Sequence, residues 1–436
     1  MKRLLSVLAG IAVLAGIAAG QSWQNGPQSP FGYTRFDGEY FPGTGRVYFL
    51  GGRIGNATTL GRIWSYDPAA GTYADLGLDM PKVVSNYDIC LLRDDHDLAG
   101  GDTWGLYLVG GRYDQAPNYT DSVQAYYPRS NTARILPTDV FPGRAGGQIT
   151  VAHSAIVHRN LMYVFGGFSQ TGNVTSAETW LFDPLADAGE RWTRLRDMVL
   201  PRAYPIAAVV DSFIYAFGGD SWRSPDSLMA RAECQRFNVN DTAAGWSLIA
   251  GLPAANGEAR AFGFDSDADH EFSGKAIVAG RGVWPSESAH CYIYDVAADS
   301  WSSFPSLAQR RRNHAGVFLP QEAGGVGAPG IWVFGGRQTS DTNTLRVSEY
   351  YAFDIVGVGD RPGRSLPAGL VAPNPARSIL RLSGTEPAKL FDPAGRELMA
   401  LRPGENDIRH LPPGVYFIRV TAPGRSETKG KVNIQR

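Results

Sequence analysis

Arginine recurs at one position of a repeated sequence pattern. Six short apolar runs each end in two small residues, usually Gly-Gly, and the residue after each pair is polar or aromatic. These residues are Arg53, Arg112, Phe168, Asp220, Arg281 and Arg337. A guanidinium group binds a carboxylate through two parallel hydrogen bonds. If the six positions face the same end of the fold, their arginines would form a positive mouth for an acidic ligand.

Segments that precede the apolar runs contribute further basic residues, namely Lys82, Arg144, Arg202, Arg260 and Arg310 to Arg312. The predicted ligand-binding residues are Arg53, Arg112, Arg281, Arg337, Arg202 and Arg260. A structural role stays open, because arginines in such loops also hydrogen-bond neighbouring turns.

Catalysis and metal binding have weaker support in the sequence than the binding of an acidic ligand. His153 and His314 occupy equivalent places in two repeats, which favours a structural role over catalysis. The segment from Asp265 to Glu271 alternates carboxylates like the start of a calcium loop but has His270 where that loop needs glycine, so a solvated hairpin tip is favoured. No catalytic residue, metal ligand or cofactor is predicted, since no nucleophile elbow, phosphate loop or zinc spacing occurs.

The repeats that carry these arginines predict the fold. Each apolar run is followed by a second run such as residues 63–68, then by a polar segment that usually holds an aromatic residue, and a further apolar segment precedes it. Four strands recurring about every 57 residues are typical of a propeller blade. Six units are found, and the sixth lacks its outer strand. The missing strand stands at the N-terminus with Trp23 and would close the ring.

The same residues resemble the kelch repeat family. The matching features are the Gly-Gly pairs, the aromatic-Asp-Pro segments at 66–68 and 182–184, and the outer-strand tryptophans. The resemblance covers roughly residues 22 to 356 and implies an all-β, six-bladed kelch-type propeller. Ala279 in the fifth Gly-Gly pair and Ala133 in place of the second outer-strand aromatic depart from the pattern.

Both ends of the chain point to export. Lys2 and Arg3, an apolar stretch to Ala19 and small residues before Gln21 indicate a signal peptide over residues 1–20. The propeller is expected over 21–356 and a linker over 357–365. Residues 366–436 alternate apolar positions between turns, which predicts a small immunoglobulin-like β-sandwich. This segment resembles the C-terminal sorting domain of the type IX secretion system, which implies outer-membrane secretion machinery as a partner and a secreted or cell-surface protein. An accessory module without an export role stays open.

The net charge and the cysteine count argue against some classes of protein. The formal net charge of -1 argues against a nucleic-acid-binding protein. The three cysteines are too few for a disulfide framework and are expected to be small buried side chains. No transmembrane segment is expected after signal removal.

Three functions remain open. The first is a binding module for an acidic glycan or a protein ligand, because a propeller displays variable loops on a rigid ring. The second is a carbohydrate-active enzyme resembling a sialate mutarotase or epimerase, in which an arginine would hold the substrate carboxylate. The third is a structural part of a surface assembly. A pocket with paired arginine and glutamate would favour the enzyme, and a flat aromatic face would favour binding or assembly.

Overall fold

The computed structural model describes residues 21–354 and 371–434, apart from 56–57, 95–102, 113–117, 170, 224–226, 284, 339–342, 373–375, 384–387, 392–396 and 421–427. The predicted signal peptide and linker lie outside the described residues. The chain divides into two compact units, one of residues 1–266 and 274–353 and the other of residues 267–273 and 354–436. No described helix is long and apolar enough to cross a membrane.

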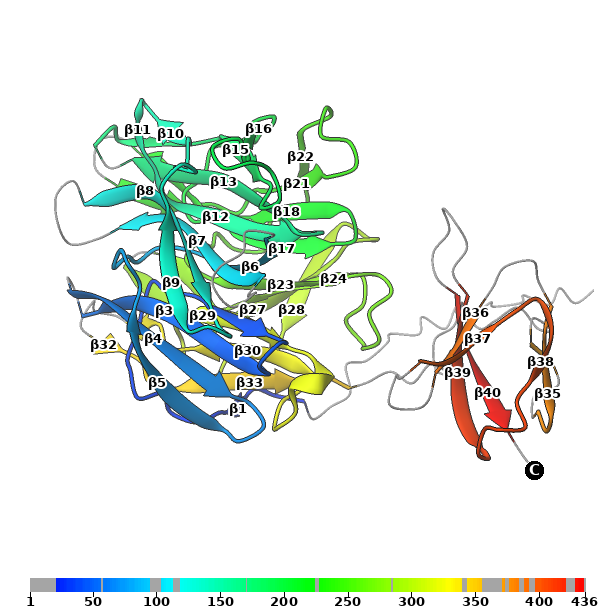
Figure 1. Ribbon diagram of the computed structural model, residues 1–436. Coiled ribbons are helices and arrows are strands. Elements are labelled where there is room, and N and C mark those ends of the chain that lie inside the picture. Colours follow the sequence, from blue (N-terminus) through cyan, green and yellow to red (C-terminus); the bar gives the residue numbers. More distant parts are fainter. Residues whose placement is uncertain are drawn as a thin grey trace, which may run out of the picture. The chain divides into compact units, whose positions relative to one another are not determined.

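The first unit consists of antiparallel four-stranded sheets that follow one another along the chain (Figure 1). From the innermost strand outward, the first sheet contains β2 (Gly38–Phe41), β3 (Arg46–Ile54), β4 (Thr58–Asp67) and β5 (Thr72–Asp79), and the second contains β6 (Cys90–Arg93), β7 (Trp104–Arg112), β8 (Tyr119–Tyr127) and β9 (Thr132–Leu136). The third contains β12 (Val151–His158), β13 (Leu161–Ser169), β15 (Thr179–Phe182) and β16 (Trp192–Arg194), and the fourth contains β17 (Ile206–Val210), β18 (Phe213–Phe217), β21 (Cys234–Asn238) and β22 (Trp246–Ile249). The next contains β23 (Arg260–Phe264), β24 (Lys275–Ala279), β27 (Cys291–Asp295) and β28 (Ser300–Phe304), and the last along the chain contains β29 (Ala315–Leu319), β30 (Gly330–Phe334), β33 (Ser348–Ala352) and β1 (Gln24–Asn25).

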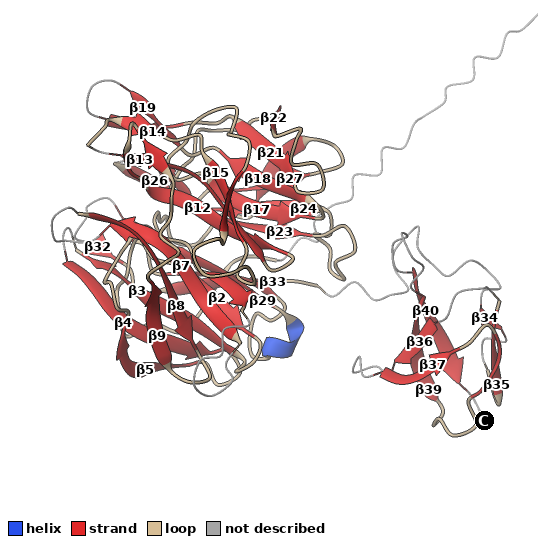
Figure 2. Ribbon diagram, turned by 45° about the horizontal axis from the view of Figure 1, so that its top comes forward, coloured by secondary structure: helices blue, strands red, loops and turns tan. Residues whose placement is uncertain are grey.

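The innermost strands form a closed circle. Each of β2, β6, β12, β17, β23 and β29 contacts the next, and β29 contacts β2. Figure 2 shows that strands dominate the unit, with η1 (Gln321–Ala323) as a single helical turn among the residues drawn in colour. These six strands therefore surround a common central axis.

Short hairpins connect or extend the sheets. They are β10 (Arg144–Ala145) with β11 (Gln148–Ile149), β19 (Asp220–Arg223) with β20 (Ser227–Ala230), β25 (Arg281–Val283) with β26 (Ser286–Ser288), and β31 (Arg337–Gln338) with β32 (Asn343–Thr344), while β14 (Val174–Thr175) pairs with β13. Three of them begin at the residue after a Gly-Gly or equivalent pair, so this repeated position starts a hairpin rather than a free loop.

The Gly-Gly pairs are required by close backbone contacts. Gly166 has φ of 74°, and a Cβ atom there would lie 2.5 Å from the carbonyl oxygen of Arg202. A side chain would be strained in this conformation and would also push neighbouring sheets apart. The repeated glycines thus allow adjacent sheets to approach near the axis.

The N-terminal strand completes the last sheet, as the sequence predicted. Strand β1 pairs antiparallel with β33, and Gly26 N–H donates a 2.9 Å hydrogen bond to the Ser348 carbonyl. Trp23 is buried, and its indole Nε1–H donates to the Pro305 carbonyl at 2.8 Å. The first and last parts of the unit are joined in one sheet, which removes an open edge.

Outer-strand tryptophans bind each sheet to the one before it. Trp192 Nε1 donates to the Asp139 carbonyl at 3.0 Å, Trp246 Nε1 to Thr179 Oγ1 at 2.9 Å, and Trp301 Nε1 to the Ala250 carbonyl at 2.9 Å. The indole rings fill apolar space between sheets while their polar N–H groups stay paired. The repeated aromatic position therefore connects neighbouring sheets.

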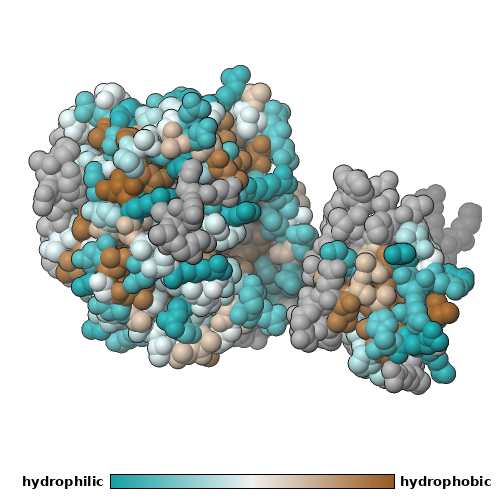
Figure 3. Space-filling model, in the orientation of Figure 1, coloured by the Kyte–Doolittle hydropathy of each residue, from teal (hydrophilic) through white to brown (hydrophobic). Residues whose placement is uncertain are grey.

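The surface drawn in Figure 3 mixes polar and apolar residues over the first unit. Its exposed large hydrophobic side chains, among the described residues, are aliphatic and come from separate parts of the chain, namely Leu60, Val140, Leu185, Val199, Leu248 and Val326. The three cysteines, Cys90, Cys234 and Cys291, are unpaired with one another and buried, as predicted.

The second unit has two antiparallel sheets. One contains β34 (Val371–Ala372), β35 (Ile379–Leu382) and β38 (Gly404–Asp407), and the other contains β37 (Glu397–Leu401), β36 (Ala388–Phe391), β39 (Gly414–Val420) and β40 (Thr428–Ile434). Leu380 and Leu382 of the first sheet share a buried cluster with Leu390 and Ile418 of the second. This unit has a hydrophobic core of its own.

Candidate functional site

A ring of six residues stands just before or at the start of the innermost strands. These ring residues are Arg35, Asn86, Ala152, Tyr204, Glu258 and Asn313, and their φ angles are 56°, 63°, 54°, 49°, 53° and 54°. None is glycine, although positive φ is unfavourable for residues with a side chain. Such strain persists where the surroundings enforce it, and it is concentrated at functional sites.

Backbone hydrogen bonds between neighbouring sheets enforce the conformation. Asn86 N–H donates to the Arg35 carbonyl at 2.7 Å, and Arg35 N–H donates to the Asn313 carbonyl at 2.8 Å. Asn313 N–H in turn donates to the Glu258 carbonyl at 2.8 Å, and Tyr204 N–H donates to the Ala152 carbonyl at 2.7 Å. The ring is therefore fixed by its own backbone, and its side chains are held in place.

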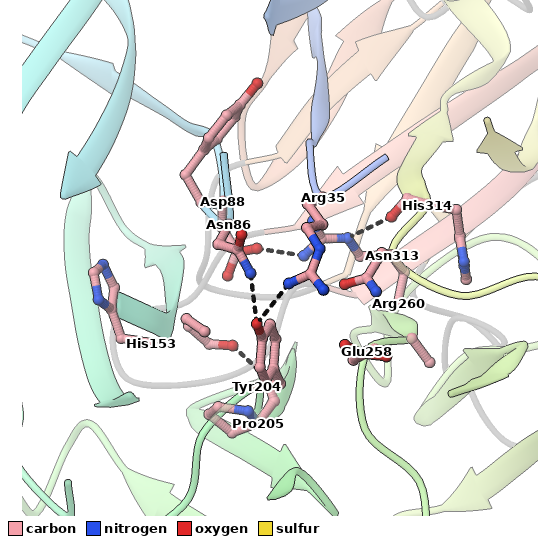
Figure 4. A pocket seen from close by; sticks show the side chains of 14 residues that line it. Arg35, Asn86, Asp88, His153, Tyr204, Pro205, Glu258, Arg260, Asn313 and His314 are labelled. Atoms are coloured by element: carbon pink, nitrogen blue, oxygen red, sulfur yellow. Dashed lines mark hydrogen bonds and ion pairs between the residues drawn. The ribbon is translucent and has the colours of Figure 1, made fainter. Parts of the chain in front are cut away.

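The ring residues line a pocket of about 40 Å³ (Figure 4). Within it the Tyr204 hydroxyl oxygen accepts hydrogen bonds from Asn86 Nδ2 at 2.6 Å and from Arg35 Nη1 at 3.1 Å. The Asn313 side chain is buried, and its Nδ2 has no hydrogen-bond partner in the described part of the chain. Three side chains from different sheets thus direct N–H donors to one small space.

Glu258 supplies the pocket with a negative charge. Its carboxylate Oε2 lies 2.7 Å from Nη1 of Arg312, and both side chains are nearly inaccessible to solvent. Burial alone would raise the pKa of the Glu258 carboxyl, but the guanidinium groups of Arg312, Arg35 and Arg337 together hold that pKa below its usual value. Glu258 is therefore ionised at neutral pH.

The closed circle of four-stranded sheets with Gly-Gly turns has counterparts among known proteins. Residues 150–199 match the Kelch motif family model. The first unit therefore has a β-propeller fold and contains one segment that matches the kelch motif. It is similar to the solved structure of YjhT, with 16% sequence identity, a TM-score of 0.54, and coverage of 75% of this chain and 97% of that chain. No curated protein matches the sequence. At this level of identity the likeness shows the fold alone.

A second acid of the propeller lies beside Glu258 and behaves in the opposite way. Burial raises the pKa of the Asp220 carboxyl well above its usual value, and the nearby Glu258 carboxylate raises it further, against the lowering effects of Arg312 and Arg202. Asp220 therefore holds its proton up to a higher pH than Glu258 does. Two acids with pKa values driven apart can serve as a proton donor and a proton acceptor.

The two predicted structural histidines line the same pocket of the propeller. His153 Nε2 lies 3.1 Å from the Val109 carbonyl, so this nitrogen carries the proton and donates. Burial lowers the pKa of His153 to about 4, and burial together with Arg311 and Arg260 lowers that of His314 well below its usual value. Both are neutral core histidines, which confirms the interpretation from their shared register.

Arg260 forms the floor of the pocket. It makes an ion pair with Asp88, lies 3.5 Å from Asp37, and donates hydrogen bonds to the carbonyls of Phe36 at 2.9 Å and His314 at 3.0 Å. Figure 4 shows its guanidinium between Asp88 and the segment of His314. Its contacts connect parts of the chain more than 170 residues apart, so Arg260 joins sheets across the channel.

The other predicted arginines take different positions, and none of them lines this pocket. Arg337 is buried and contributes to the electrostatic field at Glu258. Arg202 pairs with Glu233 at 3.1 Å, and Arg281 Nε donates to the Ala255 carbonyl at 2.8 Å. The backbones of Arg53 and Arg112 bridge to Thr34 and Ser85, with the Arg53 side chain buried and that of Arg112 half-buried.

Sequence reasoning missed the ring residues as a set. The sequence does contain a signal, because His153 and His314 each follow a ring residue directly. Aligning the six repeats at the start of the innermost strand, rather than at the Gly-Gly pair, would have placed Arg35, Tyr204 and Glu258 in one register. Their positive φ angles have no sequence signature, because none of them is a turn-forming glycine.

No group of three or more histidine, cysteine or acidic residues suited to a metal ion occurs in the described residues. In the segment considered for calcium, Asp265 Oδ1 accepts a 2.6 Å hydrogen bond from Asp211 N–H, and Ser266 N–H donates to Asp211 Oδ1 at 2.9 Å. These contacts hold two neighbouring hairpin turns together.

Proposed function

We propose that this chain is an exported six-bladed kelch propeller that binds an acidic group of a glycan or protein ligand at the pocket of the ring residues. The observation that carries the proposal is the convergence of Arg35, Asn86 and Asn313 on one space, with Asn313 Nδ2 lacking a partner among the described residues. A charged donor flanked by neutral N–H donors is suited to a carboxylate.

The size of the pocket limits what enters it. A volume of about 40 Å³ accommodates a small polar group rather than a whole sugar ring. The acidic group would enter while the rest of the ligand lies over the ends of the blades. The aliphatic character of the exposed hydrophobic residues gives less support to recognition by a flat aromatic face.

Binding is tested with the full mature chain by calorimetry, using acidic sugars, neutral sugars and acidic peptides. Arg35→Met should weaken binding of the acidic ligands at least about tenfold, since a charged hydrogen bond contributes about 1.5–3 kcal/mol. Arg93→Met, at an exposed position, is the matched control. Equal affinity of the wild type and the Arg35 variant for every acidic ligand that binds would disprove this site.

A second function is favoured by the ion pair of the pocket residue Glu258 with Arg312 and by the nearby charge of Arg35 in the same pocket. In a carbohydrate-active enzyme resembling a sialate mutarotase or epimerase, Arg35 would hold the substrate carboxylate and ionised Glu258 would accept a proton from the sugar. Glu258 would then return this proton to the sugar and regain its ionised form, so that no net proton is transferred.

The enzyme is distinguished from the binding module by turnover. Anomer interconversion of an acidic sugar, followed by proton exchange spectroscopy, should be accelerated by the wild type and lost in Glu258→Gln, with ligand affinity retained. A rate equal to that of buffer, measured with a sugar that binds, would leave binding as the function.

The proposed export rests on the sequence of the two ends. The second unit has its own core, as expected for a separate sorting domain. In a host with type IX secretion, the full chain should reach the cell surface or medium, and a chain ending at residue 365 should stay in the periplasm. Equal export of both chains would make residues 366–436 an accessory module.

A further inference from the structure

A larger chamber lies on the other side of Arg260 within the propeller channel. Its volume is about 340 Å³, and it is lined by residues at or beside the innermost strands of all six sheets. Glu39, Leu91, Val157, Ala207 and Ala261 on its wall are each partly accessible, so solvent reaches the chamber. The volume is within the usual range for small-molecule sites.

The wall of the chamber combines aliphatic side chains with polar groups, and the charges of Arg260, Asp88 and Asp37 on it are already matched. Arg260 is engaged by Asp88 and Asp37, as described above. Asp88 Oδ2 also accepts a hydrogen bond from Ala155 N–H at 3.0 Å, and Asp37 Oδ2 accepts one from Ile89 N–H at 3.2 Å. These three groups form a closed network at one end of the chamber.

Glu39 stands apart from that network. Within the described residues no ion pair joins its carboxyl to a basic side chain, and the group that stabilises its charge is the backbone N–H of Tyr40. Burial, with a smaller contribution from the charge of Asp37, raises the pKa of Glu39 to about 8. Arg260, the basic side chain among the lining residues, is engaged by Asp37 and Asp88, so Glu39 has no ion-pair partner among the described residues.

We propose that this chamber binds a small organic cation, a primary ammonium group on an aliphatic body, with Glu39 as its counter-ion. The ammonium group would supply the ion-pair partner that Glu39 lacks among the described residues, and the aliphatic body would contact Leu91, Ile156, Val157 and Ile206. Ion pairing in a site of low dielectric is strong when the geometry is good and the carboxylate has no competing partner. The site is separate from the Arg35 pocket and does not depend on the function proposed there.

Proton linkage gives the proposal a specific signature. The titratable or charged groups that face Glu39 are Asp37, Asp88, Arg260 and Cys90, and burial raises the pKa of the Cys90 thiol so that it stays neutral. Glu39 must lose its proton to bind a cation. The affinity should therefore rise nearly tenfold per pH unit from pH 6 to pH 8 and then level off, while an alkylammonium ion stays protonated up to about pH 10.

The test is calorimetric titration of the full mature chain with hexylammonium, with hexanol as the neutral probe of the same shape. Hexylammonium should bind at least about tenfold more tightly than hexanol at pH 8.5. Glu39→Gln should abolish that difference, and Ala207→Leu should weaken both probes by filling the chamber. Gln24→Ala, at an exposed position that does not line the chamber, is the control and should leave both affinities unchanged.

Two results would overturn the proposal. One is hexylammonium binding no tighter than hexanol in the wild type at pH 8.5. The other is the same hexylammonium affinity in a folded Glu39→Gln variant as in the wild type. If Glu39→Gln does not fold, the pH dependence of wild-type affinity decides, since a flat profile contradicts a role for Glu39.

Discussion

Glu258 and Arg312 join the segments that precede the neighbouring strands β23 and β29, at the edge of the pocket. The Oε2 and Nη1 atoms are 2.7 Å apart, and both side chains are almost fully buried. Asn313, which follows Arg312, donates its backbone N–H to the carbonyl of Glu258 at 2.8 Å. The ion pair and the backbone hydrogen bond together fix the ring residues Glu258 and Asn313. The position of the Glu258 carboxylate is therefore set by contacts within the propeller.

Removing one member of this pair should destabilise the propeller. Glu258→Gln or Arg312→Met alone is expected to reduce the free energy of unfolding by about 3 kcal/mol, because the remaining charge stays buried without its partner. The double variant should lose less than the two single losses added together, by about 0.5–3 kcal/mol. Urea denaturation of the four proteins measures this coupling, and strict additivity would show that the pair contributes no interaction.

The same pair sets a dependence on pH. Because the pKa of Glu258 is lowered in the folded state, its contribution is present above pH 4.5, the ordinary pKa of glutamic acid, and is lost as pH falls through the folded value. Wild type and Glu258→Gln should therefore approach each other in stability under acidic conditions. A constant difference down to pH 3 would contradict the lowered pKa.

His153 should destabilise the fold in mild acid. Its pKa falls from 6.5 to about 4 on folding, so the unfolded chain binds a proton that the folded chain does not. Stability should fall as pH decreases from 6.5 to 4, and this histidine should account for about 2–3 kcal/mol at pH 4.5. His153→Gln should show a smaller loss between pH 7 and pH 4.5 in urea denaturation, whereas an unchanged loss would assign it to other groups.

Glu39 should have the opposite effect. Its pKa is raised from 4.5 to about 8 in the folded state, so its protonated form favours folding below pH 4.5 and this advantage is lost as pH rises to 8. Glu39→Gln should match the wild type near pH 5 and exceed it by roughly 1–3 kcal/mol at pH 8.5. Thermal unfolding at the two pH values measures the effect, and a Glu39 variant less stable at pH 8.5 would contradict it.

Trp23 should be essential for closing the ring. Its buried indole lies edge-on to Tyr351, with ring centroids 5.9 Å apart, and it donates to Pro305 in the preceding sheet. Trp23→Ala is expected to reduce the free energy of unfolding by about 3–5 kcal/mol. Gln24→Ala, at the exposed neighbouring position, is the control for chemical denaturation. Equal stability of the two variants would show that the ring does not depend on this strand.

Much of the architecture could be predicted because it depends on local patterns. Alternating apolar residues and Gly-Gly pairs specify strands and turns wherever they occur, so six repeats in register predicted four-stranded units. Trp23 could be matched to the missing outer strand because most of the other repeats have an aromatic residue on their outer strand. Trp192, Trp246 and Trp301 all lie on outer strands, as that comparison required.

The site was harder to predict, since side-chain direction and pairing are not local properties. Arg281 and Arg337 share a repeat position, yet Arg281 binds a nearby carbonyl while Arg337 lies buried near Glu258. Arg260 was assigned to an entry loop, and it instead joins Asp37 and Asp88 across the channel. Which partner each arginine takes depends on which residues the neighbouring blades present.

By itself, the sequence determined the strands, the Gly-Gly turns, the place of the N-terminal strand and the equivalent repeat positions of His153 and His314, because each follows from residue type and register. Only the tertiary structure decided that Arg35, Tyr204 and Glu258 meet in one pocket. It also decided that Glu39 lines a second chamber without an ion-pair partner among the described residues. These residues are as many as 223 positions apart in the chain. Their charges and hydrogen bonds exist only when the circle of sheets closes around the axis and excludes water from it.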